Sequence, residues 1–230
     1  MRKPGKIEQA AIEAVARQFS ANVREGRDRT DAYLTHAGKR TALAVTCIES
    51  RATARAKATK PRLRFDRVAL RLVADLRAAV GGSVPEGESV LVTITAPIRL
   101  ASRTATAMAE KIRKLMSTRA APARLTDTIH GNEIRVHLLK GGTGRTARLI
   151  GFVHNPDSDP TILIDVARSL LARLGAGEPR APHRWLVVAS GDGPVPIEAC
   201  RQVCSQLGVR RVFEQTLVVL PGGQIATLTA

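Results

Sequence analysis

The apolar positions along this chain repeat with two different periods, and these predict helices that alternate with strands. A repeat every three to four residues is typical of an amphipathic helix that packs one face against a core. It covers residues 7–25, 62–80, 103–117, 160–174 and 196–208. Short runs that are rich in β-branched residues, or that strictly alternate in polarity, predict strands. They cover residues 33–36, 41–48, 89–98, 132–140, 145–154, 184–190 and 210–229, the last run being two strands joined at Pro221-Gly222-Gly223.

Two further pairs of strands are predicted to form β-hairpins. The first joins residues 33–36 to 41–48 through a turn at Ala37-Gly38-Lys39, and the second joins residues 132–140 to 145–154 through a run of glycines. Glycine suits such turns because it adopts positive φ angles at little cost. Helices alternating with strands, with hairpins among them, predict the α/β class: a mixed sheet flanked by helices.

We expect a single domain over residues 1–230, because the chain has no internal repeat and no long linker. Residues 51–124 are predicted to form a basic lobe or an insert on that domain. In the C-terminal third the predicted core residues are Leu170, Leu171, Trp185, Val187 and Leu217.

Positive charge is the strongest signal in the composition. The formal net charge is +16, and residues 1–150 contain 29 Lys and Arg against 13 Asp and Glu, whereas residues 151–230 contain seven of each. Arginine enrichment from a GC-rich genome would raise arginine along the whole chain, so it does not account for this asymmetry. A one-sided excess of this size favours a polyanionic partner, most often nucleic acid, either DNA or RNA.

The residues predicted to contact nucleic acid lie in two basic stretches. The first is the segment RATARAKATK with the helix that follows it, and the second is the outer face of the helix at residues 103–117. Aromatic residues make up 3% of the chain, which argues against recognition by base stacking and favours contacts with the phosphate backbone. The predicted contacts are Arg51, Arg55, Lys57, Lys60, Arg64, Arg67, Arg71, Arg103, Lys111 and Lys114.

Three other patterns have simpler explanations than catalysis or ligand binding. The KGGTGR stretch at residues 140–145 lacks the G-x-x-x-x-G-K-[ST] pattern and joins two predicted strands, so a turn explains its glycines. Cys200 and Cys204 share an apolar helix face without further ligands at zinc-site spacing, which indicates buried hydrophobic residues. His130 and His154 lie at predicted strand edges, where histidines without a catalytic role are common.

The segment from Asp31 to Thr46 resembles the motif region of the restriction-endonuclease-like, or PD-(D/E)-x-K, nuclease superfamily. In that fold a helix leads into a β-hairpin, an Asp lies at the first strand, and an acid-x-Lys pair on the next strand helps to hold a divalent metal ion. Here a predicted helix is followed by Asp31, a Gly-Lys-Arg turn and the strand ALAVT. The closing order of helix, WLVV strand, helix and strand pair is also similar. The resemblance implies a restriction-endonuclease-like fold.

The chain departs from that motif at the metal ligands. Ala44 stands where the acid is expected and Thr46 where the lysine is expected. Alanine provides no oxygen ligand for a hard cation. Glu49 is close in sequence, but side chains alternate along a strand, so it points away from residues 44 and 46 unless a bulge intervenes.

These observations leave three hypotheses. The first is a non-catalytic nucleic-acid-binding protein on a nuclease-like scaffold, without a cofactor. The second is an active nuclease that uses Asp31 and Glu49 with magnesium, and the third is a basic interaction module for an acidic protein or a membrane surface. Three cysteines, no export signal and no run of about 18 to 20 apolar residues predict a cytoplasmic protein without a membrane span.

Overall fold

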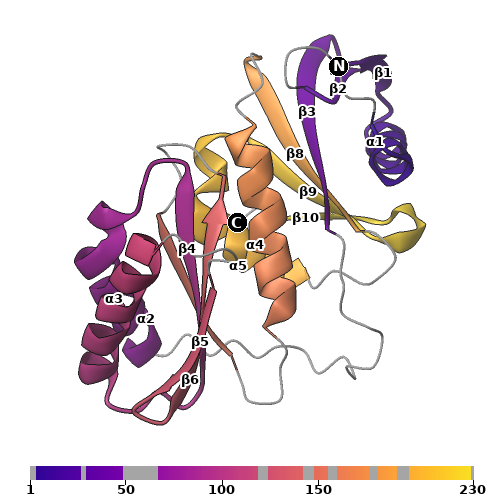
Figure 1. Ribbon diagram of the computed structural model, residues 1–230. Helices are drawn as coiled ribbons and strands as arrows, with labels where there is room; N and C mark the ends of the chain where they lie inside the picture. The colour runs from indigo at the N-terminus through magenta and orange to yellow at the C-terminus, as the bar shows by residue number, and fades with distance from the viewer. Residues whose placement is uncertain are drawn as a thin grey trace.

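The computed structural model describes residues 4–26, 30–48, 67–118, 124–141, 148–154, 160–176, 181–190 and 197–228. In these residues the chain forms five α-helices and two β-sheets, which stack in five layers (Figure 1). The helices are α1 (Lys6–Gln18), α2 (Arg67–Val80), α3 (Ala101–Thr118), α4 (Thr161–Gly175) and α5 (Ile197–Leu207). The predicted α/β class is confirmed, because both sheets are mixed and both pack against helices.

The first sheet has the strand order β1-β2-β3-β8-β9-β10. Its strands are β1 (Asn22–Glu25), β2 (Ala32–His36), β3 (Lys39–Ile48), β8 (His183–Ser190), β9 (Gln215–Val219) and β10 (Ile225–Thr227). β3, β8 and β9 are parallel neighbours, and antiparallel strands flank them on both sides. The predicted hairpin of β2 and β3 is confirmed, and its turn has positive φ at Ala37 and Gly38.

The second sheet corrects the predicted hairpin at residues 132–154. Its strands are β4 (Glu88–Thr95), β5 (Arg124–Ile129), β6 (Asn132–Lys140) and β7 (Leu149–His154), in the order β5-β6-β4-β7. β6 and β7 are therefore not neighbours, because the strongly apolar β4 lies between them and pairs with both. The true hairpin joins β5 to β6 through His130 and Gly131, which both have positive φ.

The first predicted helix was too long. α1 ends at Gln18, Ser20 has a φ of 47°, and residues 22–25 form the edge strand β1 instead of a last helical turn. Val23 fitted the helical repeat, but its side chain is 41% exposed and its backbone pairs with Leu34 of β2. One apolar residue at helical spacing was therefore a coincidence.

The second sheet is covered on one face by α2 and α3. Leu72 and Leu76 of α2 and Met108 and Ile112 of α3 are buried against it, in agreement with the helical repeat predicted over residues 62–80 and 103–117. Val68 and Ala79 also fit the helical repeat predicted over residues 62–80, but both are exposed, while Val73 and Val80 are buried in their place. The buried stripe of α2 is therefore rotated slightly from the predicted one.

The middle layer consists of α4 and α5, which pack between the two sheets. Leu170 and Leu171 of α4 are fully buried there, as are Cys200 and Val203 of α5. On the far side of the first sheet, α1 packs over Leu43, Val187 and Leu217. Trp185 was predicted to be core but is only half-buried, with its ring centroid 4.8 Å from that of Phe19. The organisation as one domain with a basic lobe at residues 51–124 stays a prediction.

Candidate nucleic-acid interface

The predicted basic residues on α2 and α3 are exposed on the outer helical layer. Arg67 and Arg71 lie on α2, and Arg103 and Lys114 lie on α3 three turns apart. Within the described part of the chain, none of these four side chains has a hydrogen-bond or ion-pair partner. They are therefore available to an anion. Five of the other predicted contacts, with Glu49, lie outside the described residues: Arg51, Arg55, Lys57, Lys60 and Arg64.

Lys111 differs from the other predicted contacts because it has an internal partner. Its Nζ lies 2.6 Å from Oδ2 of Asp127 on β5, so the pair joins α3 to the edge strand of the second sheet. The Lys111 ammonium, followed by the hydrogen bond from the Thr128 amide, holds the pKa of Asp127 below its usual value. Lys111 therefore has a local structural role whether or not it also contacts a ligand.

A second basic surface lies on the opposite face of the same sheet. β5 residues 124, 126 and 128 and β6 residues 133, 135 and 137 share this face, because side chains alternate along each strand. Arg124 pairs in register with His137, and Arg135 lies diagonally from Arg124 across the two strands. Neither guanidinium has a hydrogen-bond or ion-pair partner among the described residues.

α4 brings a third arginine to this surface. Arg168 is 56% exposed and lies close enough to His137 to act on its charge, although its Nη1 also contacts Asp165 Oδ1 at 2.9 Å. Burial, and then repulsion from Arg168, Arg124 and Arg135, lowers the pKa of His137. Three elements thus bring three arginines to one surface, where Glu133 of β6 is the acid on the same face, and the lowered pKa of His137 favours its neutral form. We call Arg124, Arg135, His137 and Arg168 the sheet cluster.

The sheet cluster is accessible because the middle layer covers only half of this face. Further along the same rows, Leu91 of β4 and Ile150 and Phe152 of β7 are buried under α4 and α5. In Figure 1 the hairpin end of β5 and β6 extends past α4, whereas β6 also packs against α4 and its Leu139 is buried in the middle-layer core. Arg124 is exposed there, and Arg135 and His137 are half-buried.

Sequence reasoning found part of this cluster without recognising it. In the predicted strand at residues 132–140, Arg135 and His137 alternate with the apolar Ile134, Val136 and Leu138, which indicates that these two side chains lie on its solvent-facing side. Strand β5 has too little apolar character to be predicted, so its pairing with β6 was missed and Arg124 could not be aligned. Arg168 is distant in sequence and joins the cluster only through the packing of α4.

Asp31, the candidate acid of the nuclease motif, is engaged in the fold. Its Oδ2 accepts a hydrogen bond of 2.7 Å from the backbone amide of Val45 and lies 3.2 Å from Nη2 of Arg173 on α4. Ala44 and Thr46 face the same helix: Ala44 is buried in the core, and the Thr46 hydroxyl donates to the Ser169 carbonyl at 3.3 Å. Among the described residues, no three His, Cys, Asp or Glu side chains are grouped closely enough to hold a metal ion.

Comparisons with known proteins identify no relative: no family model, no curated protein and no solved structure matches this chain. In the described part of the chain, every helix is too short or too polar to cross a membrane.

Proposed function

We propose that this protein binds nucleic acid through the phosphate backbone, on a nuclease-like scaffold that does not cleave it. The observation that carries the proposal is the sheet cluster. Arg124 and Arg135 are unpaired among the described residues, and Arg168 joins them from α4. Like charges repel, so their convergence costs stability unless an anion is bound there.

The chemistry of the cluster suits phosphate groups. Arginine presents a planar fork of donors that matches two oxygens of a phosphate. Arg124 and Arg135 are a diagonal pair, so their Cα atoms are about 7–8 Å apart and their long side chains can reach one phosphate or two successive ones. The hydroxyls of Thr126 and Thr128 lie on the same face and offer further donors to phosphate oxygens.

A binding role without cleavage is favoured by the surroundings of Asp31. Its carboxylate is already contacted by the Val45 amide and the Arg173 guanidinium, and Ala44 beside it offers no oxygen. A nuclease that uses Asp31 with Glu49 would have to bind its metal ion in competition with these two donors. The basic surface on α2 and α3 lies on the other face of the second sheet and would contact a longer nucleic acid that wraps around the edge strand β5.

Fluorescence anisotropy with labelled single- and double-stranded DNA and RNA tests the proposal. The variant Arg124→Gln/Arg135→Gln should weaken binding at least tenfold, about equally on unrelated sequences, because phosphate contacts carry no base information. The matched control Arg17→Gln/Arg24→Gln removes the same charge from α1 and from the edge strand β1 of the first sheet, and should change affinity far less. Equal losses in the two variants would mean that only net charge matters and would reject the sheet cluster as a site.

Two further experiments test the alternative hypotheses of an active nuclease and of a basic interaction module. Incubation of labelled DNA or RNA with magnesium should yield no cleavage above a buffer control, and cleavage abolished by Asp31→Ala would instead identify a nuclease. When bulk nucleic acid competes with anionic vesicles or with an acidic peptide for the protein, the protein should remain bound to the nucleic acid. Preferential retention of vesicles or peptide would favour the interaction module.

A further inference from the structure

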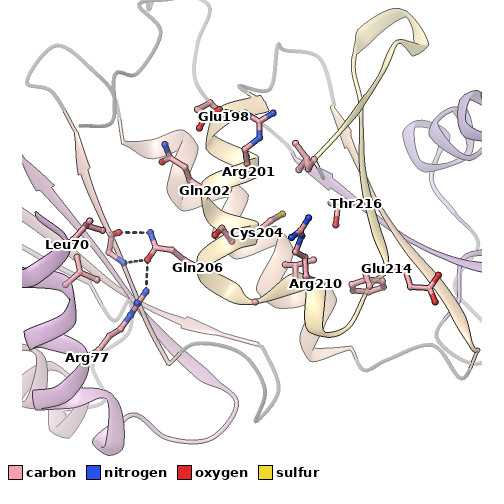
Figure 2. A pocket seen from close by; sticks show the side chains of 17 residues that line it. Leu70, Arg77, Glu198, Arg201, Gln202, Cys204, Gln206, Arg210, Glu214 and Thr216 are labelled. Carbon is pink, nitrogen blue, oxygen red and sulfur yellow. Dashed lines mark hydrogen bonds and ion pairs between the residues drawn. The ribbon is translucent and has the colours of Figure 1, made fainter. Parts of the chain in front are cut away.

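A cavity of about 500 Å³ lies between α2, α5 and the 3₁₀ turn Val209–Arg211, well separated in sequence from the sheet cluster (Figure 2). Its size is within the range of pockets that bind small molecules. Apolar side chains from three parts of the chain line it: Leu70 and Val73 of α2, Val209 and Phe213 after α5, and Leu228. Leu70 is 54% exposed, so its side chain is accessible to a ligand in this cavity.

One wall of the cavity is held rigidly by hydrogen bonds. Gln206 Oε1 accepts from the Gly151 amide at 3.0 Å and from Arg77 Nη2 at 2.8 Å, and its Nε2 donates to the Gly151 carbonyl at 2.8 Å. Figure 2 shows this side chain pointing from α5 toward Arg77 on α2. Arg77 also donates from Nε to the Leu149 carbonyl at 2.9 Å. These polar groups are satisfied internally, so they shape the cavity without being free to bind a ligand.

Charged groups around the cavity are paired, with one exception. Arg201 contacts Glu198, and Glu214 contacts His183 at 3.2 Å. Arg210 lines the same cavity but has no hydrogen-bond or ion-pair partner in the described part of the chain. In the view of Figure 2 its side chain extends alongside α5, between Cys204 and Thr216. The result is an uncompensated cation at an apolar cavity.

A second polar group in the cavity wall also lacks a partner. The Oε1 atom of Gln202 is buried, and it accepts no hydrogen bond from the described residues. Buried acceptors are usually satisfied, because leaving one unpaired costs about 1–3 kcal/mol. A ligand with a hydrogen-bond donor would satisfy it.

We propose that this cavity binds a small amphipathic anion, with its apolar body against Leu70, Val73 and Phe213 and its anionic group on Arg210. The site is distinct from the sheet cluster, so this inference does not depend on nucleic-acid binding. An anionic group opposite a guanidinium forms a charge-assisted hydrogen bond, and the apolar lining supplies the remaining contact area.

Two fluorescent probes that differ in their charge test the proposal. 1-Anilinonaphthalene-8-sulfonate carries a sulfonate and an N–H donor, and N-phenyl-1-naphthylamine is the same molecule without the sulfonate. Both should bind saturably. Arg210→Gln should lower the affinity for the sulfonate probe about tenfold and leave the affinity for the neutral probe unchanged. Arg211→Gln is the matched control, because Arg211 is exposed in the same 3₁₀ turn but does not line the cavity.

Three more measurements complete the test. Ser205 is exposed at the cavity, so Ser205→Trp should fold normally, fill the space and abolish binding of both probes. Decanoate should displace the sulfonate probe, whereas inorganic phosphate should not. A saturating oligonucleotide should leave the neutral probe bound. Equal weakening by Arg210→Gln and Arg211→Gln, unchanged binding in Ser205→Trp, or displacement of the neutral probe by the oligonucleotide would each overturn the proposal.

Discussion

Gln206 closes one edge of the second sheet, and replacing it with alanine should destabilise the protein. β7 is an edge strand, and its Gly151 has a buried backbone whose amide and carbonyl both bond to the Gln206 side chain. Each buried group left unpaired costs about 1–3 kcal/mol. We expect Gln206→Ala to lower the free energy of unfolding by about 2–4 kcal/mol, less than two full penalties, because water can enter from the neighbouring cavity.

Urea unfolding followed by circular dichroism measures this loss, provided that the m-value is unchanged. Gln206→Glu keeps the acceptor for the Gly151 amide but loses the donor to its carbonyl, so it should lose stability as well. Gln202→Ala is the control on the same helix, because no hydrogen bond of the Gln202 side chain is present in the described structure. If Gln206→Ala lowers the free energy of unfolding no more than Gln202→Ala does, the Gln206 side chain does not stabilise this edge of the sheet and the reasoning is refuted.

Three further predictions follow from the same structure. In Gly151→Ala the new Cβ would lie 2.6 Å from Val73 Cγ2, so we expect the free energy of unfolding in urea to fall by about 1–3 kcal/mol. Val73→Ala should partly rescue this loss, and strictly additive effects of the two substitutions would contradict the prediction. For Arg124→Gln/Arg135→Gln, the slope of log affinity against log salt should fall by about 1.4–1.8, and an unchanged slope would remove both residues from the phosphate contacts. The pKa of His137 lies below its ordinary 6.5, so the unfolded chain binds this proton more readily. Stability should therefore fall as the pH drops below about 6.5, and His137→Gln should flatten that part of a urea-unfolding series against pH.

The sequence predicted the buried elements well because their patterns reflect packing on a core. α4 combines a full apolar stripe with burial between two sheets, and β4 is buried on both faces. Elements at the periphery were missed or misjudged for the opposite reason. β1 is fully exposed and β5 mostly polar, so neither carries a signal beyond its backbone pairing. Pairing order depends on tertiary contacts, which is why β6 and β7 were taken for a hairpin.

The candidate site was harder to predict than the fold. Local charge density in the sequence pointed to residues 51–71, and the basic residues of that stretch that the structure describes are Arg67 and Arg71. The sheet cluster has modest charge density along the chain, and its arginines meet only through the β5–β6 register and the position of α4. Charged side chains that the fold brings together from separate elements cannot be found from the charge density of consecutive residues.

The sheet cluster also predicts a conflict between stability and binding at Arg135. This side chain is half-buried, has no ion-pair or hydrogen-bond partner among the described residues, and repels the protonated form of His137 along with Arg124 and Arg168. If it were retained for the fold alone, its removal should be destabilising. Because Arg124 and Arg168 carry the same charge nearby and Arg135 has no partner among the described residues, Arg135→Gln should instead leave the free energy of unfolding unchanged or raise it by up to about 1 kcal/mol at low salt.

The same substitution should weaken binding to single-stranded or double-stranded oligonucleotides, if Arg135 makes the phosphate contact that we propose. Arg113→Gln provides the contrast, because the Arg113 guanidinium donates to the Ala79 carbonyl at 2.9 Å and joins α3 to the end of α2. That variant should lose stability slightly and keep its affinity. Urea unfolding measures the stability of both variants, and fluorescence anisotropy measures their affinity for the oligonucleotide. If Arg135→Gln lowers stability and leaves affinity unchanged, Arg135 has a structural role. The sheet cluster would then no longer be an argument for nucleic-acid binding, because a packing role would explain why Arg135 lies there.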